Sequence, residues 1–133
     1  MQFQPFYLKQ FIEIFGAPPE SFAALGDEAV QDRLNHRALQ IPKALFDYYS
    51  LLGHHGINNQ QNRLRTIEEL DWHEDWLIFM DEDHGMVCWG IHRHGLDTPD
   101  PIVWQGILEE KMLWLQADIS LSQFLIDKWR EII

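Results

Sequence analysis

The chain has 133 residues, 46% of them hydrophobic, and carries a formal net charge of −11 at pH 7. This length fits one domain, 1–133, and the apolar content excludes a disordered chain. The single cysteine excludes a disulfide framework and a cysteine-rich zinc module.

The acidic residues are concentrated in the second half of the chain. Residues 1–66 hold six basic and six acidic residues, whereas residues 67–133 hold four basic and fifteen acidic ones. The negative charge of residues 67–133 repels nucleic acids and anionic membranes and attracts basic proteins. No signal peptide is recognisable, and no apolar run is long enough to span a bilayer. We therefore expect a cytoplasmic protein with no nucleic-acid and no membrane partner.

Two helices are predicted in the N-terminal part of the chain. Residues 6–15 place apolar side chains at the i, i+3, i+4 and i+7 spacing of an amphipathic helix, and Gly16 follows as a terminator. Residues 20–40 have a weaker helical pattern, in which Asp27 could act as a cap.

The clearest helix of the first half covers residues 42–52, where the apolar side chains share one face. A polar loop follows over 54–62, and the next few residues could form a short strand. The sequence Thr-Ile-Glu-Glu from Thr66 fits a capping box, so we expect a short helical turn over 67–71.

Short runs rich in Val, Ile, Phe and Trp follow at 76–80, 86–91, 101–104 and 112–115, with turn residues between them. This pattern predicts antiparallel strands. The second run is apolar on both faces, which places it at the centre of the sheet. A second capping box at Ser120 predicts a C-terminal helix. The fold class is therefore α+β, a single domain with a central, mostly antiparallel sheet of about four to six strands flanked by N-terminal and C-terminal helices.

The segment 81–92, DEDHGMVCWGIH, concentrates side chains that look reactive. Cys88 lies in an apolar strand without a neighbouring cation, which favours a buried small hydrophobe over a nucleophile. His92 and His94 share one side if the strand continues, but two histidines fall short of a zinc site. No nucleophile motif or phosphate-binding motif is present. We expect no enzyme, with no catalytic residue, metal or cofactor. The alternative is a small metal-dependent or carboxylate-based hydrolase that uses the two histidines and nearby acids.

All six tryptophans lie in the second half, and most of them fall in predicted strands or in the C-terminal helix, which indicates core packing. Trp72 differs because it stands in the acidic stretch ELDWHED. An aromatic side chain ringed by acids suits a protein interface as well as a core, and both alternatives stay open for Trp72.

An ordered set of motifs runs through the chain from residue 41 to residue 126: Ile41-Pro42, Phe46, Tyr49, Leu52-Gly53, Leu64, Trp76-Leu77-Ile78-Phe79, Cys88-Trp89-Gly90-Ile91, Asp100-Pro101-Ile102-Val103-Trp104, Trp114 and Leu121-Ser122-Gln123-Phe124-Leu125. In this order they resemble the SUKH superfamily, which includes fungal regulators of cell-wall synthesis and many bacterial immunity proteins of polymorphic toxin systems. Residues 1–40 stay unmatched. Ile102 stands where the Asp-Pro-Pro-Val pattern of the family has its second proline.

The resemblance implies an α+β fold and the binding of a protein partner, often a toxin that is thereby neutralised. We therefore expect a protein-binding module, an immunity protein for a toxin domain that could be a basic nuclease. A regulatory scaffold is a further alternative. The residues expected to bind the partner are exposed acids near the turns of the sheet and one aromatic residue: Asp81, Glu82, Asp83, Asp97, Asp100, Glu109, Glu110 and Trp72. For each acid taken singly, hydration of the surface is the alternative.

Overall fold

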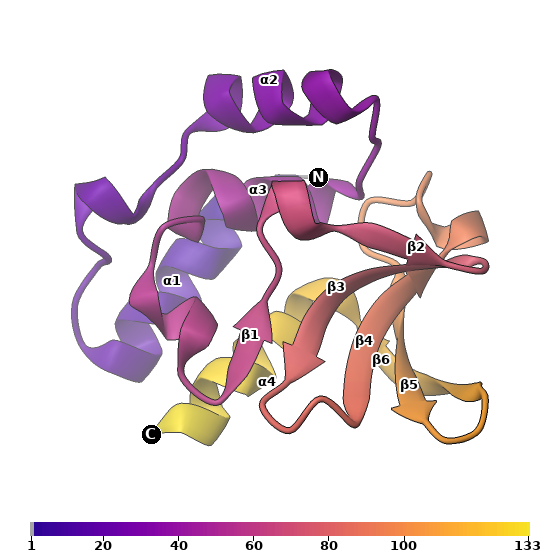
Figure 1. The fold of residues 1–133 in the computed structure, drawn as a ribbon. Helices are drawn as coiled ribbons and strands as arrows, with labels where there is room; N and C mark the ends of the chain where they lie inside the picture. Colours follow the sequence, from indigo (N-terminus) through magenta and orange to yellow (C-terminus); the bar gives the residue numbers. More distant parts are fainter. Residues whose placement is uncertain (1) are drawn as a thin grey trace.

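The computed structural model describes residues 2–133 (Figure 1). Within them, helices come first and last, and the sheet lies between, which confirms the predicted α+β class. The elements are α1 (Gln4–Phe15), η1 (Ser21–Ala23), α2 (Asp27–Arg37), α3 (Lys43–Leu52), η2 (Gly56–Asn59), β1 (Asn62–Leu64), η3 (Ile67–Glu69), β2 (Asp71–His73), β3 (Trp76–Glu82), β4 (Val87–His92), η4 (Arg93–Gly95), β5 (Ile102–Leu108), β6 (Met112–Ser120) and α4 (Leu121–Ile132), where η marks short 3₁₀ turns.

The predicted N-terminal helices form, but the cap of α2 is a different residue from the one expected. Gly26 occupies the cap position with a φ of 87°, a backbone conformation that suits glycine. Asp27 is the first helical residue, and its carboxylate accepts hydrogen bonds from Gln4 Nε2 at 2.9 Å and from the Ser50 hydroxyl. Asp27 therefore ties α2 to α1 and α3 and is not a helix cap.

The core of the helical part is aromatic, and hydrogen bonds join its central side chains. Tyr7 of α1, Tyr48 of α3 and Trp129 of α4 pack edge to face or tilted, with ring centroids 5.4 to 6.4 Å apart. The Tyr48 hydroxyl accepts from Trp129 Nε1 at 3.0 Å and donates to Asn58 Oδ1 at 2.8 Å. Three helices that are distant in sequence are thus joined by one buried cluster.

The two predicted capping boxes have different outcomes. Thr66 and Glu69 form the expected box, which begins η3. The helical turn ends at Glu69, however, and residues 71–73 form β2, because they gain hydrogen bonds by pairing with β3. At Ser120 the helix begins as expected, but the side chain of that residue makes no cap hydrogen bond.

The sheet is antiparallel throughout, and its strand order is β1-β3-β4-β5-β6. The short strands β1 and β2 pair with the same edge of β3, β1 near the end of β3 and β2 near its beginning. The central position predicted for the strand over 86–91 is confirmed, since β4 lies between β3 and β5. One irregularity interrupts the pairing of β5 and β6, where Asp118 takes a φ of 54°. A bulge of this kind bends an edge strand away from further pairing.

The helices lie on one side of the sheet (Figure 1). Phe124 of α4 packs on Phe79 and Trp89, with ring centroids 5.7 and 5.5 Å away, so these side chains mark the inner face. The opposite face of β3 and β4, turned to the viewer in Figure 1, carries no helix among residues 2–133. We call it the open face.

Candidate partner-binding face

Side chains of the strands themselves cover the open face. Gly90 of β4 and Gly106 of β5 are diagonal neighbours there, since Gly90 pairs with Trp104 and Gly106 with Cys88, and the Trp114 ring lies against both glycines. A Cβ atom at Gly90 would be 3.3 Å from this ring and one at Gly106 only 3.0 Å. The two glycines therefore provide the flat floor on which the indole of Trp114 lies.

Two further tryptophans complete a half-buried aromatic layer on the open face. The Trp76 ring stacks on Trp114 with centroids 4.8 Å apart and an interplanar angle of 10°, and Trp104 meets Trp76 edge to face at 5.7 Å. The indole N–H groups of Trp76 and Trp114 are buried without an acceptor among the described residues. Core packing, which the sequence indicated for most tryptophans, therefore does not describe these three side chains.

The candidate metal and catalytic residues near this layer are only partly brought together. His94 N–H donates to His92 Nδ1 at 3.2 Å, and the two imidazole rings lie 4.8 Å apart. Asp100 lines the same groove as the two histidines, but both of its oxygens accept hydrogen bonds from Ser122. Within residues 2–133, no three His, Cys, Asp or Glu side chains are grouped to hold a metal ion. Cys88 is buried as expected, and burial raises the pKa of its thiol.

Four of the acids expected to bind a partner come together at one end of the sheet. Glu82 is the last residue of β3 and Asp83 follows it in the turn to β4, while Glu109 and Glu110 lie in the β5–β6 turn. In an antiparallel sheet these two turns lie at the same end. None of the four carboxylates makes an ion pair in the part of the chain that the structure describes. We call this group the acidic end.

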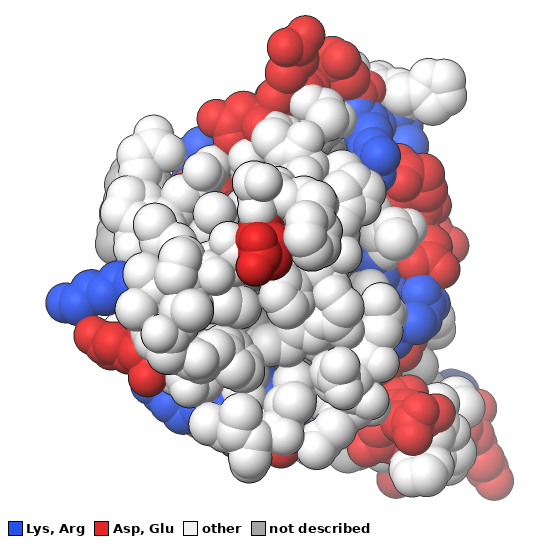
Figure 2. All heavy atoms as spheres, turned by 90° about the vertical axis from the view of Figure 1, so that its left-hand side faces the viewer, with Lys and Arg blue, Asp and Glu red and all other residues white. Residues whose placement is uncertain are grey.

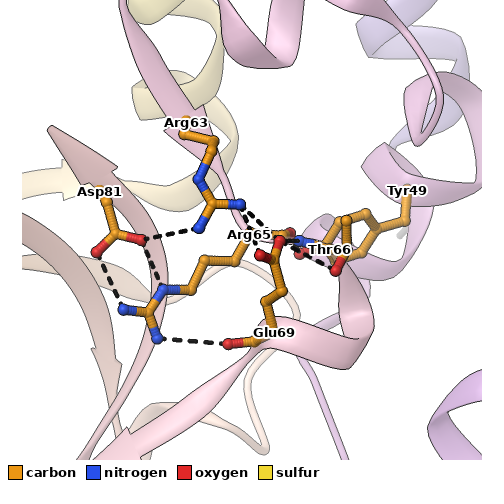
Figure 3. A network of polar contacts seen from close by, with 6 residues as sticks. All are labelled: Tyr49, Arg63, Arg65, Thr66, Glu69 and Asp81. Atoms are coloured by element: carbon orange, nitrogen blue, oxygen red, sulfur yellow. Dashed lines mark hydrogen bonds and ion pairs between the residues drawn. The ribbon is translucent and has the colours of Figure 1, made fainter. Parts of the chain in front are cut away.

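Asp81 does not belong to this group, although the sequence placed it in the same turn. It lies in β3 and accepts from Arg65 Nε at 2.7 Å and from Arg65 Nη2 at 3.0 Å (Figure 3). Arg63 lies on its other side and binds Glu69 at 2.6 Å. Asp81 is therefore a member of a charged network that joins β1, β3 and η3.

Asp100 is also engaged within the chain. It accepts from Ser122 N–H at 2.8 Å and from the Ser122 hydroxyl at 2.6 Å, in the first turn of α4. The Asp100 carboxylate thus supplies the helix cap that Ser120 was expected to provide. A carboxylate at this place satisfies a free backbone N–H and interacts favourably with the helix dipole.

The two remaining candidates lie at the opposite end of the sheet from the acidic end. Asp97 is exposed and its carboxylate lies 3.4 Å from Gln40 Nε2. Trp72 is half-buried against the core, and the Arg93 guanidinium lies 4.7 Å above its ring. Trp72 therefore contacts the core and is covered by a cation instead of being ringed by acids, and its place in an interface stays a prediction.

The charged residues are unevenly spread over the surface. Figure 2 shows the side that includes the connection between α1 and α2, and side chains other than Lys, Arg, Asp and Glu fill most of this view. Apart from an acidic side chain near the centre, charged side chains gather toward its edges. A basic partner gains little attraction on this side, which favours other parts of the surface for an electrostatic contact.

No protein-family model matches the chain, and neither a curated protein nor a solved structure matches it. Within residues 2–133, the helices are too short or too polar to cross a bilayer.

Proposed function

We propose that this chain is a protein-binding module of the SUKH type, an immunity protein that occludes a basic bacterial toxin domain. The observation that carries the proposal is the acidic end, where four carboxylates at two neighbouring turns make no ion pair with any residue from 2 to 133. The SUKH assignment rests on the ordered motifs of residues 41–126.

The acidic end supplies the electrostatic part of such an interaction. A nuclease toxin binds a polyanion and therefore exposes Lys and Arg around its active site. The four carboxylates of the acidic end create a negative potential that attracts this positively charged surface, which raises the association rate. Asp81 is ion-paired with Arg65, and Asp100 accepts hydrogen bonds from Ser122, so these two carboxylates are less available to a basic partner.

The open face supplies the apolar part. Protein interfaces have an apolar centre with aromatic anchors and a polar rim. Trp76, Trp104 and Trp114 form a half-buried layer of this kind. A partner seated on this face and reaching the acidic end would therefore meet both kinds of contact.

The proposal is tested by reversing three exposed or half-exposed acids of the acidic end in one variant, Glu82→Lys, Glu109→Lys and Glu110→Lys. Asp83 is left unchanged because aspartate supports the backbone of tight turns. The matched control reverses three exposed acids of the first half that make no ion pair among the described residues: Glu13→Lys, Glu20→Lys and Asp32→Lys. The two variants have the same net charge.

Tagged wild-type protein is used to capture its partner from the native cell, and co-expression with the captured protein is scored for growth. We expect wild type and the control variant to capture the same partner and restore growth, while the acidic-end variant loses both. Equal capture by the two variants would contradict the role of the acidic end. A captured protein whose expression is harmless would contradict the immunity function.

A further inference from the structure

A narrow groove lies on the open face, next to the acidic end. Its apolar lining comes from the buried side chains of Ile78 in β3 and Cys88 in β4 and from Met86, Leu108 and Met112. The ion-paired side chains of Arg65 and Asp81 also line it. The hollow measures about 100 Å³. For scale, a cavity of roughly 150 Å³ in a protein core holds a benzene molecule, so this hollow has room for one aliphatic side chain. We call it the methionine groove.

The walls of the methionine groove expose apolar surface that the fold leaves uncovered. Met86 is 53% exposed and Leu108 is 46% exposed, although both line the groove together with the buried side chains of Ile78 and Cys88. Met112 is half-buried. Methionine side chains are flexible and polarizable, and they adapt their shape to a bound apolar group. The groove is thus suited to receive a side chain from another molecule.

The charges around the groove indicate what kind of molecule that is. Met86 belongs to the turn that carries Glu82 and Asp83, and Leu108 directly precedes Glu109 and Glu110. The one cation in its lining, Arg65, is neutralised by its ion pair with Asp81, and the acidic end makes no ion pair among residues 2–133. A largely apolar hollow beside such carboxylates attracts a segment in which Lys or Arg flank a large apolar residue. A second copy of this chain is repelled, because it carries the same net charge of −11.

We propose that the methionine groove accepts one large aliphatic side chain from a basic segment of the protein partner. The inference rests on the proposed function and specifies the chemistry of the partner at one point of the interface. Lysine or arginine on either side of the aliphatic residue pairs with the acidic end, while the aliphatic side chain displaces water from Ile78 and Cys88.

Two synthetic peptides test the inference, GKKSLSKKG and GKKSASKKG, which differ only in the central Leu or Ala. The chain is labelled with ¹³C at its methionine methyl groups, and each peptide is titrated while the methyl signals are recorded by NMR. Met86 and Met112 line the groove, whereas Met80 is only 5% exposed in the core and serves as the internal reference.

We expect the signals of Met86 and Met112 to shift while that of Met80 stays in place. The leucine peptide should bind at least about fivefold more tightly than the alanine peptide, because burying each additional CH₂ group gains about 0.8 kcal/mol. Equal affinities for the two peptides, or shifts that are as large at Met80, would overturn the inference. Shifts that grow with protein concentration without peptide would do so too, since they would indicate a second copy as the occupant.

Variants separate the groove from other exposed apolar surface. Met86→Ser with Leu108→Ser should abolish the preference for the leucine peptide. Leu8→Ser with Ile12→Ser, which changes two apolar side chains of α1 that are 37% and 41% exposed, should retain it. If the peptides bind equally while the acidic-end variant still loses its captured partner, the groove inference fails and the proposed function stands. If the peptide preference is present but charge reversal leaves capture intact, the proposed function fails instead.

Discussion

Replacing Asp100 by alanine should destabilise the protein without any partner being present. The Asp100 carboxylate accepts two short hydrogen bonds, from the Ser122 N–H at 2.8 Å and from its hydroxyl at 2.6 Å. Ser122 is only 6% exposed, so its donors would be left without water once the carboxylate is removed. A hydrogen bond to a charged group contributes about 1.5–3 kcal/mol, and the loss of a helix cap costs about 1 kcal/mol. Because these contributions overlap, we expect a loss of about 2–3 kcal/mol in the free energy of unfolding.

Urea unfolding followed by tryptophan fluorescence measures this loss. With a slope of about 1.5 kcal/mol per M urea, the midpoint should fall by about 1.5 M. The matched control is Asp97→Ala, because Asp97 is exposed and its one contact, to Gln40, is long at 3.4 Å. The control should stay within about 0.5 kcal/mol of wild type. If the Asp100 variant were as stable as the control, the cap would not have the role that its geometry assigns to it.

Two further predictions concern the open face and the charged network. Gly106→Ala should cost about 1–3 kcal/mol of unfolding free energy, because the added methyl group would lie 2.9 Å from Cys88 Sγ and 3.0 Å from the Trp114 ring. Gly56→Ala, where nothing lies within 4 Å, should cost much less, and equal urea midpoints would contradict the account of close packing at Gly106. The hydrogen bonds from Arg63 lower the pKa of Glu69 to about 2, so its contribution to stability is present above pH 4.5 and is lost as the pH falls toward 2. Glu69→Gln should therefore show a flatter pH dependence of stability over this window, and an unchanged slope would refute that reasoning.

Much of the fold could be predicted from local signals. The helix expected over 42–52 begins at Lys43 and ends at Leu52, because Pro42 and Gly53 limit it on both sides. The hairpin strands were placed correctly because turn residues separate short apolar runs. Such features depend on neighbours in sequence, which pattern reasoning captures. The sequence does not predict the strand over 71–73, because three residues are too few to show an alternating hydrophobic pattern. They form a strand because they pair with β3.

The candidate site was harder to predict because it depends on contacts between distant residues. Asp81 and Glu109 look alike as sequence positions, but Arg65 binds the first and no cation among the described residues pairs with the second. The partner of Asp100 is 22 positions away, and a local capping box at Ser120 offered a misleading alternative. Contacts between residues distant in sequence therefore decide which carboxylates the fold uses.

The position of Trp114 in the aromatic layer also depends on contacts between distant residues, although the sequence contains one signal for it. Trp114 was expected in the core because tryptophan usually packs there. Its place on the open face depends on the neighbouring positions Gly90 and Gly106, which leave room for a flat ring. Two glycines at outward positions of adjacent strands indicate that something large lies above them. The sequence contains both glycines, but their register becomes known only once the strands are paired.

The central claim is that the acidic end attracts a basic protein partner, and the salt dependence of association tests it most directly. The association rate constant of the captured partner is measured by stopped-flow fluorescence from low ionic strength to physiological salt, where the Debye length shrinks to about 8 Å. Our account predicts that the rate for wild-type protein falls steeply with added salt, and that the dependence is much flatter for the variant with Glu82, Glu109 and Glu110 changed to lysine. Equal salt dependence for the two proteins would contradict it.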